Sequence, residues 1–264
     1  MRSILFGNVR GINPKTNRSK IEIISDIAEI NNSDIIPLCE SHLQDEIGDS
    51  EVKMRDFEIH RCDRKGRTHG GVLIYTRSVI KATKILEFRN AQVECVGILV
   101  KDLNLMLFCV YRPPVSGNKE LFKECLDTIQ ETINVFYKCA SRIVICGDFD
   151  FQFISWPEGG FLGRRSSTDR EKMQADELLD FMEDNNLANL SVTPTRGNNI
   201  LDLMLTNLNG SLCYEKTYVN KQLSDHNFMV FNYNQKKMKC NPYDNGIFMY
   251  DISEDSDEWY ILTR

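Results

Sequence analysis

The chain has 264 residues, of which 42% are hydrophobic and 27% are charged. Both fractions are near the averages of globular proteins, so they argue against a disordered chain and allow one large domain with a sizeable core. The net charge is -6, but residues 251–264 carry five acids and one arginine. The charge of the remaining chain therefore neither indicates nor excludes a polyanionic substrate.

Cysteine usage and hydropathy predict a soluble, intracellular protein. The nine cysteines are dispersed, and no Cys/His spacing resembles a zinc site, which favours a reducing compartment. No apolar run is long enough to cross a bilayer, and the apolar N-terminal stretch is too short for a signal peptide, so no membrane partner is expected. We expect one domain over residues 1–233, followed by a linker and an acidic, partly disordered tail over 234–264.

The first elements expected are a strand, a helix and a second apolar run. Residues 3–9 are apolar and precede a Gly-Ile-Asn-Pro turn, and residues 19–31 show apolar positions at helical spacing. The next apolar run, 35–39, ends at Glu40. Pro37 argues against a central strand there, because proline cannot donate a hydrogen bond to a neighbouring strand.

Residues 57–111 are predicted to form a meander of antiparallel hairpins. Short polar turns separate strand-like segments at 71–75, 95–100 and 105–111. A basic loop over residues 61–71, which contains Arg67, lies among these segments. A solvated loop and a phosphate-contacting loop explain its charge equally well.

The second half of the chain is expected to contain two amphipathic helices, over 118–138 and 169–184, and a last strand over 228–231. After the first helix, four consecutive apolar residues end at Gly147, which is typical of a fully buried strand. An extended chain beyond it would place Asp148 and Asp150 on one side. Two like charges on one side need a cation, or one of them must hold a proton.

Seven polar residues lie at or beside the end of an apolar segment. They are Asn8, Glu40, Asp148, Asp150, Asp202, Asp225 and His226. Strand ends in a layered domain meet at one rim, so these residues are expected to gather in one site. Carboxylate and amide oxygens suit a hard cation such as Mg²⁺, and a carboxylate beside an imidazole suits general acid–base work. Each signal is weak alone, since an isolated Asp after a strand is more often a turn residue.

Several longer motifs carry a more specific signal through their order. They are Asn8-Val9-Arg10-Gly11, Glu40, Gly70-Gly71-Val72-Leu73-Ile74-Tyr75, Tyr111-Arg112-Pro113-Pro114, Gly147-Asp148-Phe149-Asp150, Pro194-Thr195-Arg196, Leu201-Asp202-Leu203-Met204-Leu205-Thr206-Asn207 and Ser224-Asp225-His226. On these motifs the chain resembles the endonuclease/exonuclease/phosphatase superfamily. More narrowly, it resembles the apurinic-type endonuclease domain of LINE-type non-LTR retrotransposons. The resemblance covers about residues 3–233.

The resemblance implies a fold and a reaction. The fold class is α/β, a four-layer α/β sandwich in which two mainly antiparallel β-sheets pack face to face with helices on the outside. The reaction is nicking of DNA by Mg²⁺-dependent phosphodiester hydrolysis that leaves a 3′-hydroxyl, with Mn²⁺ as an alternative cofactor. The intact parent polyprotein is expected to include a reverse transcriptase, which this sequence lacks, and the resemblance implies a nuclear location.

The resemblance also implies a role for each site residue. Glu40 would be the principal metal ligand, assisted by Asn8 and Asp225. Tyr111 would bind the scissile phosphate, Asp148 would position the attacking water, and His226, oriented by Asp202, would stabilise the developing charge. The residues expected to contact DNA are Arg10, Arg67, Arg112 and Thr195.

Asp150 departs from the family motif, which has asparagine at this position. An amide donates a hydrogen bond to a phosphate oxygen, whereas an ionised carboxylate only accepts and repels the phosphate. Asp150 therefore joins the metal shell or holds a proton, or the enzyme is impaired. Two alternatives to an active nuclease remain open. One is a remnant that at most binds nucleic acid, and the other is a phosphoesterase acting on another phosphate ester, such as an inositol phosphate.

Overall fold

The computed structural model describes residues 3–12, 14–66, 69–114, 120–152, 154, 156, 169–208 and 210–233. The α-helices in these ranges are α1 (Pro14–Ile30), α2 (Glu120–Phe136) and α3 (Asp169–Asp184), and two short 3₁₀ turns cover Asp49–Glu51 and Lys101–Leu103. The tail predicted over 234–264 lies outside the described residues. None of the helices in the described part of the chain is long and apolar enough to cross a membrane.

The strands form two six-stranded sheets. Sheet A has the order β11-β12-β1-β2-β4-β3, with β11 (Leu212–Tyr218), β12 (Phe228–Tyr233), β1 (Ser3–Asn8), β2 (Ser33–Cys39), β4 (Val72–Arg77) and β3 (Phe57–Cys62). Sheet B has the order β5-β6-β7-β8-β10-β9, with β5 (Ala82–Arg89), β6 (Glu94–Val100), β7 (Leu105–Tyr111), β8 (Arg142–Asp148), β10 (Asp202–Thr206) and β9 (Ala188–Asn189). One central pair of each sheet is parallel, β1 with β2 and β7 with β8, and the other pairs are antiparallel.

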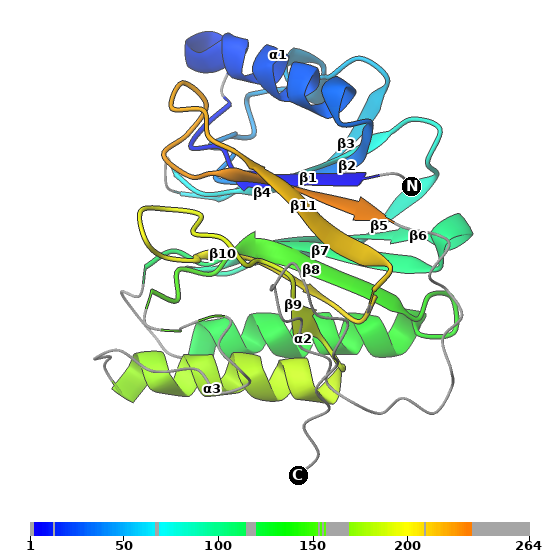
Figure 1. Ribbon diagram of the computed structural model, residues 1–264, viewed down its shortest axis with the longest axis vertical. Coiled ribbons are helices and arrows are strands. Elements are labelled where there is room, and N and C mark those ends of the chain that lie inside the picture. The colour runs from blue at the N-terminus through cyan, green and yellow to red at the C-terminus, as the bar shows by residue number, and fades with distance from the viewer. Residues whose placement is uncertain are drawn as a thin grey trace, which may run out of the picture.

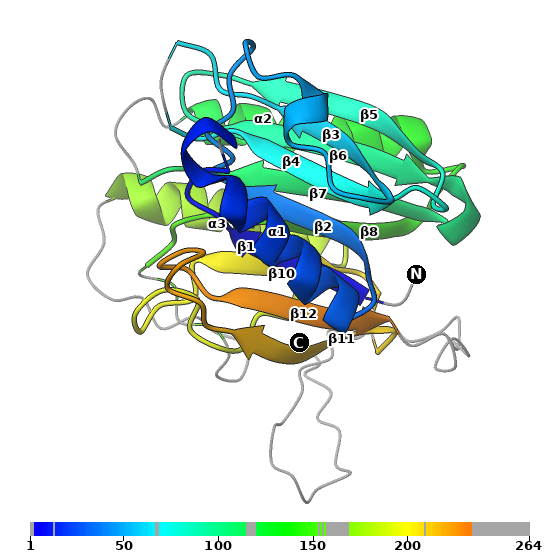
Figure 2. The ribbon, with the colours of Figure 1, turned by 90° about the horizontal axis from the view of Figure 1, so that it is seen from above.

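The molecule has four layers. Helix α1 covers the outer face of sheet A, and α2 and α3 cover the outer face of sheet B (Figures 1 and 2). Three apolar clusters fill the spaces between the layers, around Ile24 and Phe228 under α1, Phe6 and Cys109 between the sheets, and Phe108 and Phe122 under α2. The predicted four-layer α/β sandwich is confirmed.

Strand β2 shows why the strands are apolar along their whole length. Ile35 and Cys39 belong to the cluster between the sheets, whereas Ile36 and Leu38 belong to the cluster under α1. Successive side chains of a strand point to opposite faces, and both faces of sheet A are covered. Each strand of the sandwich interior therefore needs a continuous apolar run, and the first polar residue marks the point where it leaves the core.

Two local predictions were wrong. Strand β2, which contains Pro37, is a central strand between β1 and β4. Its pairing with β1 passes from Ile4–Ile35 to Gly7–Leu38, and Pro37 falls in this gap, where its missing N–H is tolerated. The segment 57–111 is not one meander either. Strands β3 and β4 pair in sheet A, whereas β5, β6 and β7 pair in sheet B.

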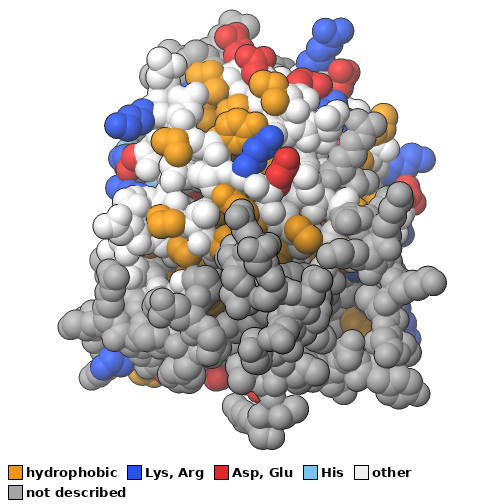
Figure 3. Space-filling model, in the orientation of Figure 1, with side chains coloured by type: hydrophobic (Ala, Val, Ile, Leu, Met, Phe, Trp, Pro, Cys, Tyr) orange, Lys and Arg blue, Asp and Glu red, His pale blue; other side chains and the backbone are white. Residues whose placement is uncertain are grey.

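Small, separate groups of apolar side chains lie on the face seen in Figure 1, and most of the Lys and Arg side chains visible there lie along its margins (Figure 3). These margins include the left edge, where β1 and β8 end in Figure 1.

All eight cysteines in the described residues are free thiols, and most are buried.

Candidate active site

The strand ends at one edge of the sandwich bring the predicted residues together. Asn8 ends β1 and pairs in register with Cys39, so Glu40 follows directly beside it. In sheet B, Asp148 ends β8 and pairs with Tyr111 of β7 on one side and with Asp202 of β10 on the other. His226 precedes β12, which runs antiparallel to β1 and therefore begins at the same edge. Residues from six strands thus meet at this edge, because neighbouring strands present their ends there.

Gly147 allows sheet B to bring Asp148 close to its neighbour strand. A Cβ at this position would lie 2.1 Å from the carbonyl oxygen of Val110 in β7. Only glycine avoids that overlap, so β8 and β7 approach closely just before both strands reach the site.

The backbone at the site bends sharply. Four of the non-glycine residues with positive φ lie here: Arg10 (45°), Glu40 (54°), His42 (53°) and Asp150 (48°). The left-handed region is unfavourable for these side chains, so the surrounding packing must impose it. At Asp150 this turn breaks the extended geometry that was expected to place both carboxylates of the Gly147–Asp150 motif on one side.

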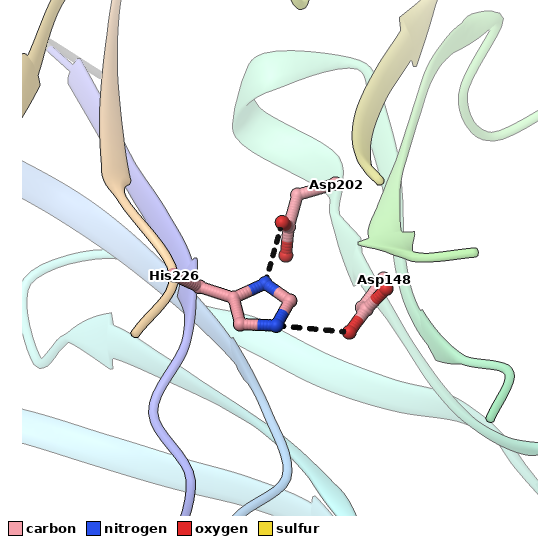
Figure 4. A group of neighbouring side chains, drawn as sticks. All are labelled: Asp148, Asp202 and His226. Carbon is pink, nitrogen blue, oxygen red and sulfur yellow. Dashed lines mark hydrogen bonds and ion pairs between the residues drawn. The ribbon is translucent and has the colours of Figure 1, made fainter. Parts of the chain in front are cut away.

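His226 lies between two buried carboxylates, one from each of two strands of sheet B (Figure 4). Its Nδ1 is 2.8 Å from Asp202 Oδ2, and its Nε2 is 3.9 Å from Asp148 Oδ2. Burial opposes the charge on the imidazole, but the charge and hydrogen bond of Asp202 outweigh it and raise the pKa of His226 to about 9. At neutral pH the ring is therefore an imidazolium that donates Nδ1–H to Asp202 and directs Nε2–H towards Asp148.

The Asn8 amide joins the two halves of the site. Its Nδ2 donates to Glu40 Oε1 and to Asp148 Oδ2, both at 2.8 Å, and its Oδ1 accepts the backbone N–H of Arg10 at 3.1 Å. A backbone N–H can only donate, so it fixes the amide in this orientation. Asn8 was expected to assist metal binding, for which its oxygen would be needed, but it presents its nitrogen to the carboxylates.

Glu40 is an ionised carboxylate of the site. Burial opposes its ionisation, but hydrogen bonds from His42 and Asn8 outweigh this effect and lower the pKa of Glu40 to about 2. The His42 contact joins Nε2 to Glu40 Oε2 at 2.9 Å. Burial and the charges of Glu40 and Asp148 raise the pKa of Tyr111, so its phenol remains a hydrogen-bond donor. Burial and the neighbouring Asp202 raise the pKa of Asp148 well above its ordinary value.

Asp225 lies at the site, but its carboxylate is ion-paired with two arginine side chains. Arg10 Nη1 and Arg196 Nη2 both lie 2.9 Å from its Oδ2. Burial opposes its ionisation, but the hydrogen bond from Arg10 and the charge of Arg196 lower the pKa of Asp225. In this arrangement Asp225 acts as the anion of an ion-pair cluster, whereas the sequence predicted a metal ligand.

Two residues expected at the DNA surface are buried. Arg112 is 2% exposed and donates to the carbonyl of Phe149 at 2.7 Å and to Gln174 at 2.6 Å. Thr195 is fully buried, and its hydroxyl accepts the backbone N–H groups of Leu201 and Asp202. Both side chains are therefore buried supports of the site and do not face solvent. The expectation that they contact DNA directly is corrected.

The remaining members of the predicted DNA surface differ in position. Arg10 is half exposed at the site. Arg67 lies outside the described residues. Elsewhere in the basic loop, Arg61 binds Asp63 and Arg64 binds Glu94, so these two cations are already paired. This pairing favours the structural interpretation of the loop for both arginines.

The Asp150 carboxylate makes no hydrogen bond to the His226 cluster among the contacts of the described residues, although the charge of His226 still influences it. Its carboxylate accepts a hydrogen bond from Gln152 at 3.2 Å. Burial raises the pKa of Asp150, although Gln152 and the charges of Arg112 and Arg196 oppose the shift. The carboxylate is thus held among neutral and cationic groups near the site.

Sequence reasoning missed His42 and Arg196. His42 stands two residues after Glu40, so the two side chains can share one side of the chain, and this spacing could have indicated the contact. Arg196 belongs to a motif that was noted without a role for its guanidinium. Its partner Asp225 comes from a distant loop, and no local pattern predicts that pairing.

The donor set fits a divalent cation. Among the residues that the structure describes, side-chain atoms of Asp148, Asp202 and His226 lie within 4.8 Å of one another, and the two carboxylates supply oxygen ligands, whereas the protonated His226 ring supplies none. Asp202 Oδ1 is buried and has no hydrogen-bond partner in the described ranges. Glu40 adds an ionised carboxylate next to this group. Such oxygen-rich sites suit hard cations, and an imidazolium beside them can stabilise a developing negative charge.

Comparisons with known proteins agree with this geometry. Residues 105–230 match the family model described as endonuclease-reverse transcriptase. Among solved structures, the endonuclease domain of TRAS1, a telomere-specific non-LTR retrotransposon, is 16% identical with a TM-score of 0.55, and the match covers 90% of this chain and 100% of that chain. No curated protein matches the sequence.

Two further structures show the same fold with other named activities. The 3′ phosphatase NExo from Neisseria, bound to a product DNA hairpin, is 17% identical with a TM-score of 0.59 and covers 89% of this chain and 100% of its own. A mannosyl-6-phosphatase from Bacteroides thetaiotaomicron is 13% identical with a TM-score of 0.55 and covers 88% of this chain and 98% of its own.

The fold is therefore that of the hydrolytic nucleases and phosphatases. Residues 105–230, just under half of the chain, are similar to the endonuclease-reverse transcriptase family, and the solved structures share the fold of the whole described domain. Both findings agree with the resemblance that the sequence motifs indicate.

Proposed function

We propose that this protein is a divalent-metal-dependent DNA endonuclease, derived from a non-LTR retrotransposon, that nicks DNA by hydrolysing one phosphodiester bond. The observation that carries the proposal is the continuous set of contacts from Asp202 through His226 and Asp148 to Asn8 and Glu40. This set of side chains combines the His226 imidazolium, the Asp148 carboxylate with its raised pKa and the ionised Glu40 carboxylate at one edge of the fold. Groups of these three kinds can stabilise developing charge, accept a proton from water and hold a cation in phosphodiester hydrolysis.

Glu40 would be the principal ligand of the cation, Mg²⁺ or Mn²⁺. A bound divalent cation supplies positive charge beside the phosphate and lowers the pKa of its bound water. Glu40 is ionised at any physiological pH, as a ligand must be. Asn8 positions the Glu40 and Asp148 carboxylates through its Nδ2, and Asp225 remains paired with its arginines.

The other residues act on the phosphate and the water. The Tyr111 phenol donates a hydrogen bond to a phosphate oxygen. Asp148 accepts a proton from the attacking water, for which its raised pKa makes it a better base than an ordinary aspartate. The His226 imidazolium, held by Asp202, stabilises the charge that develops on the phosphate.

The choice of DNA as substrate rests on the similarity of this chain to two solved structures. The TRAS1 match is an endonuclease domain of a non-LTR retrotransposon, and the NExo structure holds a DNA hairpin. Both support a nucleic-acid substrate for this chain. The description of the matching family, endonuclease-reverse transcriptase, supports a reverse transcriptase as a partner, and a DNA target supports a nuclear location.

A plasmid-nicking assay tests the proposal. Supercoiled plasmid incubated with the protein and Mg²⁺ or Mn²⁺ should become open circular, and EDTA should stop the reaction. Glu40→Gln should lower the nicking rate by about 100-fold or more, because the amide lacks the charge that holds the cation. Glu58→Gln is the matched control, since this glutamate is exposed and lies at the opposite end of sheet A, paired with Thr76. Equal rates for Glu40→Gln and the parent would contradict the assignment.

Asp150 favours a second candidate, an impaired remnant of the same fold that at most binds nucleic acid. Its carboxylate stands where the family motif has an amide, and burial raises its pKa. If the parent does not nick plasmid and Asp150→Asn does, decay of an ancestral nuclease is supported. If the two nick equally, a carboxylate is tolerated at this position.

The match to a mannosyl-6-phosphatase supports a third candidate function, that of a phosphoesterase acting on another phosphate ester. A substrate panel with DNA, sugar phosphates and inositol phosphates separates it from the nuclease. Turnover of a small phosphate ester without any nicking would replace the proposed substrate and leave the fold assignment intact.

A further inference from the structure

Two arginines from different loops meet at one carboxylate oxygen beside the site. Arg10 follows β1, and Arg196 lies in the loop between β9 and β10. Their guanidinium groups each lie 2.9 Å from Asp225 Oδ2. The three side chains are 52%, 46% and 38% exposed, so solvent and a substrate can reach them. One carboxylate cannot neutralise two guanidinium groups, and the cluster keeps a net positive charge.

The cluster of Arg10, Arg196 and Asp225 lies at a cleft beside Glu40. Arg10 and Asp225 line a cleft of about 620 Å³ together with Glu40, Lys20 and Lys221. Even without its two histidines, His42 and His69, the cleft has more cationic than anionic side chains. Arg196, which pairs with Asp225 and is not among the residues that line this cleft, also lies near Asp150, whose carboxylate is influenced by its charge. The cluster therefore has Glu40 near Arg10 and Asp150 near Arg196.

We propose that Arg10 and Arg196 form a binding fork for a backbone phosphate next to the scissile one, and that Asp225 holds this fork open when DNA is absent. The inference rests on the proposed function and names how the same site anchors its DNA. A carboxylate oxygen and a phosphate oxygen accept the same guanidinium donors, so the Asp225 Oδ2 atom occupies the place that a phosphate oxygen would take. Lys20 stabilises the Arg10 side of the fork, since its Nζ donates to the carbonyls of Val9 and Arg10 at 2.7 and 3.1 Å.

This assignment differs from metal ligation in a measurable way. A metal ligand at position 225 would matter for cation binding and leave metal-free DNA binding little changed. A carboxylate that competes with phosphate for two arginines must weaken DNA binding without any metal. Removing its charge should therefore tighten metal-free binding, whereas removing an arginine should weaken it.

The test is fluorescence anisotropy of a labelled DNA duplex in EDTA, repeated over a range of KCl concentrations. Asp225→Asn should lower the Kd about 3- to 10-fold, because the amide removes the competing charge and keeps the side-chain shape. Arg196→Gln should raise the Kd about 10-fold and reduce the slope of log Kd against log salt by about one, the value of one phosphate contact. Arg196→Lys should restore the slope, since lysine keeps the charge.

Arg55→Gln is the matched control. Arg55 is 94% exposed and precedes β3, whose first residue pairs with Arg77 at the end of sheet A opposite to the site. Its Kd should equal that of the parent. Weaker or unchanged metal-free binding in Asp225→Asn, or an unchanged salt slope in Arg196→Gln, would overturn the inference. A parent protein that binds DNA with the expected slope but does not nick it would leave the fork in place and remove the proposed nuclease function.

Discussion

His226 offers the deepest test of the electrostatics of the site. Its pKa is raised from 6.5 to about 9, and its side chain is only 2% exposed, so solvent screens the interaction weakly. A shift of this size corresponds to about 3 kcal/mol in favour of the imidazolium. Burial alone would lower the pKa, and Asp202 is the largest contribution that raises it. Asp202→Asn removes that charge but keeps an oxygen that can accept the Nδ1–H.

The assay is an NMR titration of the imidazole resonances. The chain has four histidines, so His226→Gln identifies the signal. We expect His226 to titrate near pH 9 in the parent and near or below 6.5 in Asp202→Asn, because burial and the more distant Asp148 then remain. His60 is the internal comparison, since burial lowers its pKa and Asp202→Asn should not move it.

The same pair gives a pH dependence of stability. The folded-state pKa of His226 lies above the unfolded value, so its contribution is fully present below about pH 6.5 and is lost as the pH rises through about 9. The difference in unfolding free energy between the parent and Asp202→Asn should therefore be larger at pH 6 than at pH 10. A His226 that titrates near 6.5 in the parent, or an Asp202→Asn variant that still titrates near 9, would refute the reasoning.

Two further predictions concern stability. Gly147→Ala should lower the free energy of unfolding by about 2–4 kcal/mol in urea denaturation, because its Cβ would overlap the carbonyl of Val110 in β7; a loss below about 1 kcal/mol would show that the strands can separate without cost. Arg112→Met should cost about 2–4 kcal/mol by the same measurement, because the carbonyl of Phe149 loses its buried donor; a neutral or stabilising effect would mean that the apolar side chain replaces the charge without loss.

The sequence predicts the layers and the place of the site because both follow from local patterns. Continuous apolar runs mark strands that are buried on both faces, and the first polar residue after each run marks the edge of the sandwich. Glu40 and Asp148 could be placed there from their position alone. Pro37 shows the limit of this reasoning, since a gap in the pairing with β1 lets it lie in a central strand.

The partners of individual side chains could not be predicted in this way. Asp225 is bound by two arginines from separate loops. Arg112 is buried and donates a hydrogen bond to Gln174 of α3. These pairings depend on loop paths and helix packing. The orientation of the Asn8 amide depends on a single backbone N–H of the following turn. Residue type and spacing indicate which groups gather, whereas hydrogen-bond geometry decides what each of them faces.

The 3′ end of the product tests the central claim most directly. Plasmid treated with the parent protein and Mg²⁺ should carry nicks that a DNA polymerase extends without further processing, because hydrolysis on the leaving 3′-oxygen side produces a free 3′-hydroxyl. Plasmid treated with Glu40→Gln should support about 100-fold less extension. Nicks that require removal of a 3′-phosphate before extension, or equal extension after treatment with Glu40→Gln, would contradict the proposal that this site hydrolyses DNA to a primer end.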